Sequence, residues 1–344
     1  VRYQRQEKLP EIGMKGQERL KNSHVLVVGA GGLGCPVLTY LVAAGVGALT
    51  IIDNDIISES NLNRQVLYGL SDVGKSKVEV ARQRLAAQNA EVKVEVIKSE
   101  INLINAQELI KGKDVVVDCT DNMATRYLLS DVSELCSVPL VFGGIHRFQG
   151  QITVFNSKNG ISYRDLFPYD SQKVQPSSCN ENGVLGVVPG VIGIYQAIEV
   201  LKIIAGFGDV LDGKMAVVNL KNLQNQIFGI QKEKRDKIQK LVELPEYEHL
   251  CFADYSDCIS VGEFLKMDFD TLDLVDIRGE EELPKSILKI TEEKNCEASN
   301  LVLLCQTGKR TRVALQDWKV KYPKKKIYSL EGGVEELNAA LIQK

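Results

Sequence analysis

The sequence contains the stretch Val25-Leu26-Val27-Val28-Gly29-Ala30-Gly31-Gly32-Leu33-Gly34, in which an apolar run breaks into a glycine-rich turn. A strand that ends in such a turn and continues as a helix presents bare backbone N–H groups to a phosphate. We therefore expect Gly29, Gly31, Gly32 and Gly34 to line a nucleotide site. NAD, FAD and ATP sites all share this pattern, so the charged residues that follow it must distinguish them.

Strand-like and helix-like runs alternate on both sides of the turn. This alternation predicts an α/β fold with a Rossmann-like, doubly wound and mainly parallel sheet. The expected strands are residues 24–28, 49–52, 92–97, 115–117 and 140–142, and the expected helices are 32–44, 75–87 and 124–135. Beyond these, we expect an antiparallel extension with strands 150–155, 215–220 and 225–230, interrupted by an apolar helix at 191–204.

At 344 residues the chain exceeds what one hydrophobic core usually organises, so two domains are expected. We place the first at residues 1–232, a charged linker at 233–250 and a small α/β domain at 251–344. The second domain should have parallel strands at 272–276, 301–304 and 326–330, with helices at 311–318 and 334–342.

Composition and charge are those of an ordinary soluble protein. Hydrophobic residues make up 44% and charged residues 25% of the chain. The net charge of −3 gives no reason to expect nucleic acid or a membrane as a partner. The apolar tract at 184–198 is broken by glycines and a proline, so we expect a buried helix. Eight cysteines without any C-x-x-C favour free thiols in the cytoplasm.

The charged residues behind the turn suit a triphosphate better than a dinucleotide. Asp53 closes the second strand, where an acid can accept hydrogen bonds from ribose hydroxyls. Asp118 and Asp121 follow the strand 115–117, where a carboxylate can hold Mg²⁺ against phosphate oxygens. Arg64 and Lys77 add two cations, and fixed positive charge stabilises the charge that builds as pyrophosphate leaves.

Four motifs resemble the signatures of the MoeB/ThiF family, relatives of ubiquitin-activating enzymes. The likeness covers roughly the first 230 residues and is specific in combination. The motifs are Arg2-Tyr3-Gln4-Arg5-Gln6, Gly29-Ala30-Gly31-Gly32-Leu33-Gly34, Ser60-Asn61-Leu62-Asn63-Arg64-Gln65 and Asp118-Cys119-Thr120-Asp121-Asn122.

The resemblance implies an ATP-dependent enzyme that adenylylates the C-terminal glycine of a ubiquitin-like sulfur carrier ending in Gly-Gly. It implies a site in which Asp53 binds ribose, Asp121 ligates Mg²⁺ and Gln65 orders the pocket. The phosphate contacts that it implies are Asn61, Arg64 and Lys77, and Asp55 and Asn122 belong to the same nucleotide site. Arg5 would reach the ATP of the opposite subunit, which implies a homodimer.

Cys305 is the stronger of two candidate reactive cysteines. The run Cys305-Gln306-Thr307-Gly308-Lys309-Arg310 follows an expected buried strand and opens a helix, where backbone N–H groups and the helix dipole favour a thiolate or persulfide. A phosphatase would place arginine six positions after its cysteine, and that position is Thr311. The loop instead resembles that of a rhodanese, as do Asp276-Ile277-Arg278 and Leu330-Glu331-Gly332-Gly333.

Two further features complete the expected site. Cys179 lies in a polar loop ahead of the apolar helix, and the resemblance makes it a candidate for a transient acyl or disulfide linkage to the carrier; an inert loop thiol is the alternative. Ser162-Tyr163-Arg164-Asp165 stands where family members often carry C-x-x-C, and a second such pair is also missing. We therefore expect no structural zinc.

The leading hypothesis is an adenylyltransferase fused to a rhodanese-like sulfurtransferase. A persulfide on Cys305, charged by a donor such as a cysteine desulfurase, would convert the acyl-adenylate to a thiocarboxylate. A MoaD-like carrier would mean molybdopterin synthesis and a ThiS-like carrier thiamine synthesis; the rhodanese fusion favours the first. The glycine turn and Asp53 alone also permit an NAD-dependent oxidoreductase, and a non-catalytic scaffold that binds ubiquitin-like proteins is the third hypothesis.

Overall fold

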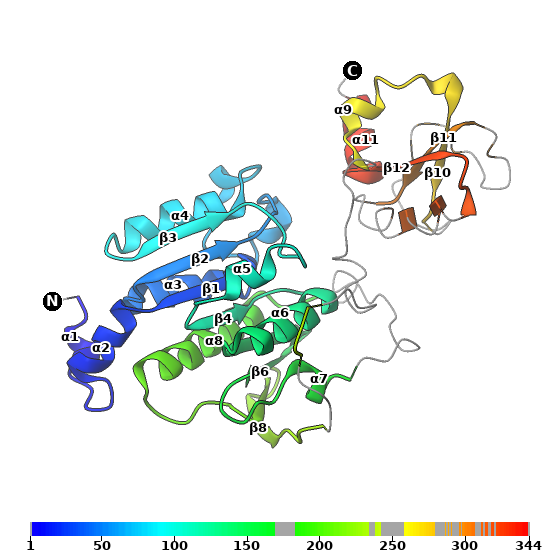
Figure 1. Ribbon diagram of the computed structural model, residues 1–344. Coiled ribbons are helices and arrows are strands. Elements are labelled where there is room, and N and C mark those ends of the chain that lie inside the picture. The colour runs from blue at the N-terminus through cyan, green and yellow to red at the C-terminus, as the bar shows by residue number, and fades with distance from the viewer. Residues whose placement is uncertain are drawn as a thin grey trace. The chain divides into compact units, whose positions relative to one another are not determined.

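The buried run that precedes the glycine turn forms β1 (His24–Val28), in the interior of an eight-stranded sheet (Figure 1). The computed structural model divides into two units, Val1–Leu250 and Cys251–Lys344, which are described separately. It describes residues 2–168, 183–233, 238–241 and 258–278, and then 286, 288, 290, 296, 298–306, 311, 314–315, 318–319 and 321–342.

The large sheet of the first unit has the order β3-β2-β1-β4-β5-β6-β7-β8. Its first five strands pair in parallel and the last three are added antiparallel, as the sequence predicts. The remaining strands are β2 (Ala48–Ile52), β3 (Lys93–Ile97), β4 (Val115–Asp118), β5 (Leu140–His146), β6 (Gln149–Phe155), β7 (Lys214–Asn219) and β8 (Gln224–Gly229).

Helices cover both faces of this sheet, which explains why its central strands are apolar on both sides. On one face α3 packs against α4 and α8, and on the other α5 packs against α6 (Figure 1). The helices are α1 (Gln4–Glu7), α2 (Gly13–Lys21), α3 (Gly34–Ala44), α4 (Lys77–Gln88), α5 (Ala106–Ile110), α6 (Met123–Cys136), α7 (Tyr163–Leu166) and α8 (Val187–Ala205).

The apolar helix α8 meets length and composition criteria for a membrane span, but it packs against α3, β5 and β6. Val188, Ile192 and Val200 are fully buried in the core that it shares with α3. A Cβ at Gly193 would lie 2.4 Å from the carbonyl oxygen of Leu33, so the helix closes directly on the glycine turn. The structure therefore uses this helix as a core element of the nucleotide half.

The second unit has a four-stranded parallel sheet of order β10-β11-β12-β9. Alternate residues of β11 fill cores on opposite faces: Val302 and Leu304 pack with α11, and Leu301 and Leu303 pack with Leu315. Its elements are β9 (Cys258–Ile259), α9 (Val261–Phe264), β10 (Leu272–Asp276), β11 (Asn300–Leu304), β12 (Lys326–Leu330) and α11 (Gly333–Ile342).

Candidate active site

The carboxyl ends of β1, β2 and β4 meet at one edge of the sheet. Val28 lies in register with both Ile52 and Asp118. The backbone N–H of Gly29 donates to Ile52 (2.9 Å), and that of Cys119 donates to Val28 (2.9 Å). This register brings the glycine turn, the segment after β2 and the segment after β4 to one place, where open parallel sheets bind ligands.

Two glycines are required by the turn itself. Gly29 has φ of +96°, and a Cβ there would lie 2.8 Å from the carbonyl oxygen of Cys119. A Cβ at Gly34 would lie 2.1 Å from the carbonyl oxygen of Gly29. At Gly31 a Cβ would meet only the amide nitrogen of Gln65, at 3.7 Å, and at Gly32 it would touch Pro189. Gly31 thus leaves its backbone bare beside Gln65.

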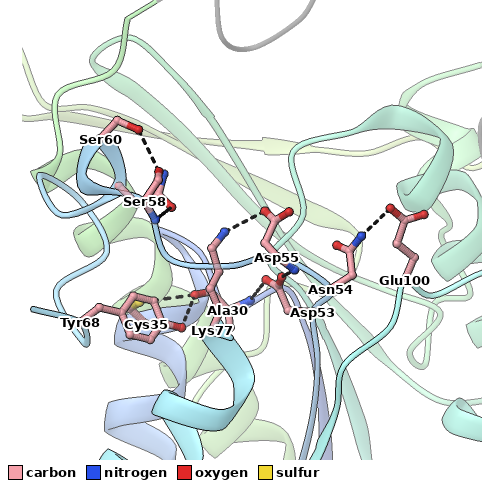
Figure 2. A network of polar contacts seen from close by, with 11 residues as sticks. Ala30, Cys35, Asp53, Asn54, Asp55, Ser58, Ser60, Tyr68, Lys77 and Glu100 are labelled. Atoms are coloured by element: carbon pink, nitrogen blue, oxygen red, sulfur yellow. Dashed lines mark hydrogen bonds and ion pairs between the residues drawn. The ribbon is translucent and has the colours of Figure 1, made fainter. Parts of the chain in front are cut away.

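Asp53 ties the turn to the segment after β2 (Figure 2). Its Oδ2 accepts from the N–H of Ala30 at 2.7 Å and its Oδ1 from the N–H of Asp55 at 2.8 Å. Burial raises the pKa of Asp53, against the lowering effects of Lys77 and of these N–H groups. Each carboxylate oxygen can accept a second hydrogen bond, so the side chain can still receive ribose hydroxyls.

Lys77 is the buried cation of this edge. Its Nζ lies 2.8 Å from Oδ2 of Asp55, and its backbone N–H donates to the Asp55 carbonyl at 3.1 Å. Figure 2 shows the ammonium group pointing from the start of α4 toward the segment that follows β2. Lys77 and Asp55 are therefore brought together with Asp53, as expected of nucleotide-site residues.

The segment 58–65 carries Asn61, Arg64 and Gln65. Oδ1 of Asn61 accepts from the N–H of Ser58 (3.3 Å), and Nη1 of Arg64 donates to the carbonyl of Ser60 (2.9 Å). Gln65 is buried and its Oε1 has no hydrogen-bond partner in the part of the chain that the structure describes. A buried acceptor without a donor beside bare glycine backbone fits a ligand that brings its own donor.

The loop after β4 presents two carboxylates in different settings. Asp118 is fully buried, and its Oδ1 accepts from the N–H and hydroxyl of Thr120 (2.9 and 2.6 Å). Its Oδ2 accepts no hydrogen bond among the described residues and lies 3.9 Å from Nε of Arg126. Burial raises the pKa of Asp118, against the lowering effects of Arg126 and of the two hydrogen bonds from Thr120. Asp121 is exposed. Oδ1 of Asn122 accepts from the N–H of Thr125 (2.8 Å) and so caps the start of α6.

These carboxylates fit nucleotide-bound Mg²⁺, which needs one or two carboxylates and takes its other ligands from phosphates and water. The exposed carboxylate of Asp121 can supply one such ligand, and Oδ2 of Asp118, which accepts no hydrogen bond among the described residues, can supply a second. Within the described ranges, no group of three histidine, cysteine or acidic side chains forms an all-protein metal site.

The segment 162–165, which stands where family members often carry C-x-x-C, is held by hydrogen bonds. Asp165 Oδ2 accepts from the N–H and hydroxyl of Ser162 (2.7 and 2.8 Å), which caps α7. Its Oδ1 accepts from the N–H of Glu233 at 2.9 Å. Arg164 pairs with the fully buried Asp131, with Nη2 at 2.6 Å from Oδ2. The segment near the end of the first domain is thus tied to α7 by a carboxylate.

Arg5 does not join this site within one chain. It is exposed on α1, and the neighbouring Tyr3 packs on Gly45 at the end of α3, where β2 is about to begin. The Tyr3 hydroxyl accepts from Nδ2 of Asn89 (2.8 Å), which follows α4. This is the edge of the sheet opposite to the glycine turn.

Three residues that support the site by hydrogen bonds were not predicted from the sequence. The Tyr68 hydroxyl donates to the carbonyl of Ala30 (2.7 Å), and Nη2 of Arg126 donates to that of Thr120 (2.8 Å). Gln196 of α8 donates to the carbonyl of Asp118 (2.7 Å) and is fully buried. A lone amide within an apolar helix was the available signal for Gln196; nothing in the sequence marked the other two.

In the second unit, Cys305 follows β11 and is buried, with 1% of its surface exposed. The carbonyl of Cys305 accepts a hydrogen bond from the N–H of Val334 (2.9 Å). The carbonyl of Gln306 accepts one from the N–H of Glu335 (3.3 Å). A Cβ at Gly333, which has φ of +56°, would lie 2.2 Å from the Cys305 carbonyl oxygen. The start of α11 is therefore packed directly on Cys305 and Gln306.

A network of charged and polar groups, in which the Arg278 side chain is buried, orients Gln306, the residue after Cys305. Nε and Nη2 of Arg278 bind the two carboxylate oxygens of Asp276 at 3.0 and 2.7 Å. Nη1 donates to Oε1 of Gln306 at 2.5 Å, whose Nε2 donates to Glu335 at 2.7 Å. The motif 276–278 thus holds Gln306 in place. Cys179, Lys309, Arg310 and Arg312 lie outside the described residues.

Comparisons with known proteins agree with this geometry. Residues 3–240 match the ThiF family. MoeZ of Mycobacterium tuberculosis, named a probable adenylyltransferase/sulfurtransferase, is 37% identical over 342 residues, covering 92% of this chain and 87% of the relative. The adenylyltransferase and sulfurtransferase MOCS3 of Drosophila sechellia is 36% identical over 370 residues, covering 97% and 82%.

Solved structures share the fold of the first unit. MccB of E. coli, crystallised with succinimide, superposes with a TM-score of 0.61 at 23% identity, covering 68% of this chain and 73% of that chain. PaaA superposes with a TM-score of 0.57 at 24% identity, covering 67% and 72%. The family match spans more than half of the sequence, and the curated relatives extend over both units. The chain therefore belongs to the ThiF family.

Proposed function

We propose that this protein adenylylates the C-terminal carboxylate of a ubiquitin-like sulfur carrier with ATP and Mg²⁺, and then transfers sulfur to it from Cys305. The observation that carries the first reaction is the buried Lys77 beside Asp53, Asp55 and the glycine turn. Relatives that match both units are named adenylyltransferases and sulfurtransferases, which supports the pairing of the two activities.

In the first unit, the cationic and the acidic residues would bind different parts of the nucleotide. The glycine turn and Lys77 would hold the phosphates, and Asp53 would accept the ribose hydroxyls. Mg²⁺ held by Asp121 would neutralise charge on the phosphates. The attacking carboxylate is already ionised, so the site needs to position it and to screen its charge, without a general base.

The competing hypothesis of an NAD-dependent oxidoreductase does not explain this concentration of cation and carboxylates at one edge. A purely scaffolding role does not explain why Lys77, Asp121 and Cys305 are all retained beside the elements that would use them. We place the reactions in the cytoplasm, where thiols such as Cys305 stay reduced.

The first test is ATP–pyrophosphate exchange with a recombinant MoaD-like or ThiS-like carrier that ends in Gly-Gly. Asp121→Ala should abolish the exchange, and Asp209→Ala, an exposed carboxylate on another segment, should leave it unchanged. Cys305→Ala should retain exchange and lose thiocarboxylate formation. Exchange that persists in Asp121→Ala would refute the metal role of Asp121, and exchange that requires no carrier would refute the adenylylation proposal. The MoaD-like carrier is the one we expect to react.

Arg5 provides a test of the dimer. Because it lies on the edge opposite to its own glycine turn, we propose that it serves the site of a second subunit. Arg5→Ala and Lys77→Ala should each be inactive alone. Mixed after subunit exchange, they should recover about a quarter of wild-type exchange, since half of the dimers then hold one intact site. No recovery would mean that Arg5 and Lys77 of the same subunit serve one site, which would overturn the proposal.

A further inference from the structure

A buried hydroxyl group lies next to the sulfur of Cys305, and a second buried hydroxyl group lies next to the first. Oγ1 of Thr311 is 3.8 Å from Sγ of Cys305 and 2.7 Å from Oγ of Ser329. Thr311 and Ser329 are both fully buried. The three residues come from separate places in the sequence: the end of β11, a helical residue after the Cys305 loop, and β12. The fold thus builds a short chain of polar groups that begins at the sulfur.

A chain of two hydroxyls can serve either protonation state of a thiol. Each hydroxyl has one hydrogen to donate and lone pairs to accept. With a neutral thiol, the S–H donates to Thr311 and Thr311 donates to Ser329. With a thiolate, Ser329 donates to Thr311 and Thr311 donates to the sulfur. Apart from the loss of the thiol proton, the two arrangements differ only in the rotation of the hydroxyl hydrogens.

We infer that Thr311 is a positioning residue for Cys305, which donates a hydrogen bond to the sulfur whenever it carries negative charge, and that Ser329 orients the Thr311 hydroxyl. The inference rests on the proposed sulfur transfer by Cys305. A negatively charged sulfur is stabilised by hydrogen-bond donors, and the Thr311 hydroxyl lies within hydrogen-bond distance of the buried Sγ.

The charge on Sγ changes in both halves of the transfer. In charging, the Cys305 thiolate attacks the outer sulfur of thiosulfate; the new S–S bond forms, the bond to the sulfite group breaks and sulfite leaves with the electron pair. In discharge, cyanide attacks the outer sulfur of the persulfide; thiocyanate forms, and the electron pair of the broken S–S bond returns to Sγ. A donor to Sγ stabilises the nucleophile in the first step and the leaving group in the second.

Thr311 occupies the sixth position after Cys305, where a phosphatase would need an arginine. A threonine hydroxyl is neutral, so it can follow the sulfur through both states without holding it permanently ionised. Hydrogen bonds to an ionised partner are stronger than neutral ones, so the interaction contributes most when the sulfur is charged.

The test uses the full-length protein and single-turnover charging with thiosulfate, followed by mass spectrometry of the persulfide and by thiocyanate formation with cyanide. Thr311→Val, which keeps the shape and removes the hydroxyl, should slow both steps about tenfold or more, the loss expected for a hydrogen bond to a charged group. Thr311→Ser should restore rates to near wild type. Ser329→Ala should be intermediate, and Thr271→Val, an exposed hydroxyl in the same unit, should have no effect.

Wild-type rates in Thr311→Val, or a Thr311→Ser variant as slow as Thr311→Val, would overturn the inference. Alkylation of Cys305 by iodoacetamide at neutral pH separates this inference from the proposed function. If the wild type accepts no sulfur, the proposed function fails, and a tenfold slower alkylation of Thr311→Val still supports the role of the hydroxyl. Equal alkylation rates in the wild type and in Thr311→Val would refute the role of the Thr311 hydroxyl, whatever the sulfur assay shows.

Discussion

The ammonium group of Lys77 lies 2.8 Å from the carboxylate of Asp55, in a pair whose two members differ sharply in exposure. Only 6% of the Lys77 side chain is exposed, against 51% for Asp55. A buried cation is therefore balanced from the solvent side by an acid that an incoming phosphate can replace. The neighbouring Asp53 accepts hydrogen bonds from two backbone N–H groups, which hold its side chain in place.

This arrangement predicts opposite effects of Asp55→Asn with and without nucleotide. Without ATP, Tm should fall by about 2–4 °C, corresponding to about 1 kcal/mol for a pair that is half screened by water. With MgATP, the rise in Tm should exceed that of the wild type, because phosphate then supplies the missing charge. Thermal shift assays measure both values. Glu79→Gln, in the exposed pair with Arg82, is the matched control and should change neither. A smaller rise than in wild type would mean that Asp55 holds the nucleotide directly.

Gly34→Ala should abolish ATP binding, because the new Cβ would lie 2.1 Å from the carbonyl oxygen of Gly29 and displace the turn. Gly190→Ala is the control: nothing lies within 4 Å of a Cβ there, and alanine should stabilise α8 by about 0.5–1 kcal/mol. Isothermal titration with ATP and chemical denaturation of each variant would check both. Normal ATP affinity in Gly34→Ala would contradict the tight turn.

The cysteine beneath the glycine turn should resist alkylation at ordinary pH. Burial raises the pKa of Cys35 to about 11, and the same cause raises the pKa of Cys119. Only the thiolate reacts, so modification of Cys35 should be slow at pH 8 and accelerate as the pH approaches 11. Iodoacetamide labelling over a pH series, read by peptide mass spectrometry, would show it. Rapid labelling of Cys35 at pH 7 in the folded protein would disagree with its burial.

The buried pair of Arg164 and Asp131 should be sensitive to removal of one partner. Arg164→Met would leave the fully buried Asp131 carboxylate without its guanidinium and cost about 3 kcal/mol of unfolding free energy. The double variant Arg164→Met with Asp131→Leu should recover most of that loss. Arg82→Met, from an exposed pair, should cost little. Urea denaturation would measure all of these, and a double variant as unstable as the single one would argue against an electrostatic cause.

Sequence patterns predicted the sheet well because its central strands are buried on both faces and read as apolar runs. The expected strand 24–28 and β1 coincide, and 272–276 coincides with β10. The expected strand 140–142 continues to His146, because pairing with β6 extends it through two glycines. The helix expected from residue 32 begins at Gly34, since the turn occupies the residues before it. The two-residue strand β9 is held by its partner and carries no pattern of its own.

Site residues could be predicted where they lie at strand ends and helix starts. They could not be predicted where they depend on contacts between residues that are distant in the sequence. Asp53 and Lys77 could be placed because strand ends and helix starts meet at one edge. The pairing of Lys77 with Asp55 could not, because it depends on the path of the intervening segment. Gln196 contacts Asp118 across 78 residues, a relation that only the folded chain reveals.

Because α8 packs on the glycine turn, truncated forms of this protein must keep α8. Gly193 touches the Leu33 carbonyl and Pro189 faces Gly32, so a helix from late in the chain supplies one wall of the turn that opens it. Gln196 adds a bond to the end of β4. A fragment that stops at residue 168 would contain all the nucleotide motifs and yet expose the apolar surface that α8 covers. Shortened versions made for crystallography or engineering must therefore retain the chain through Ala205.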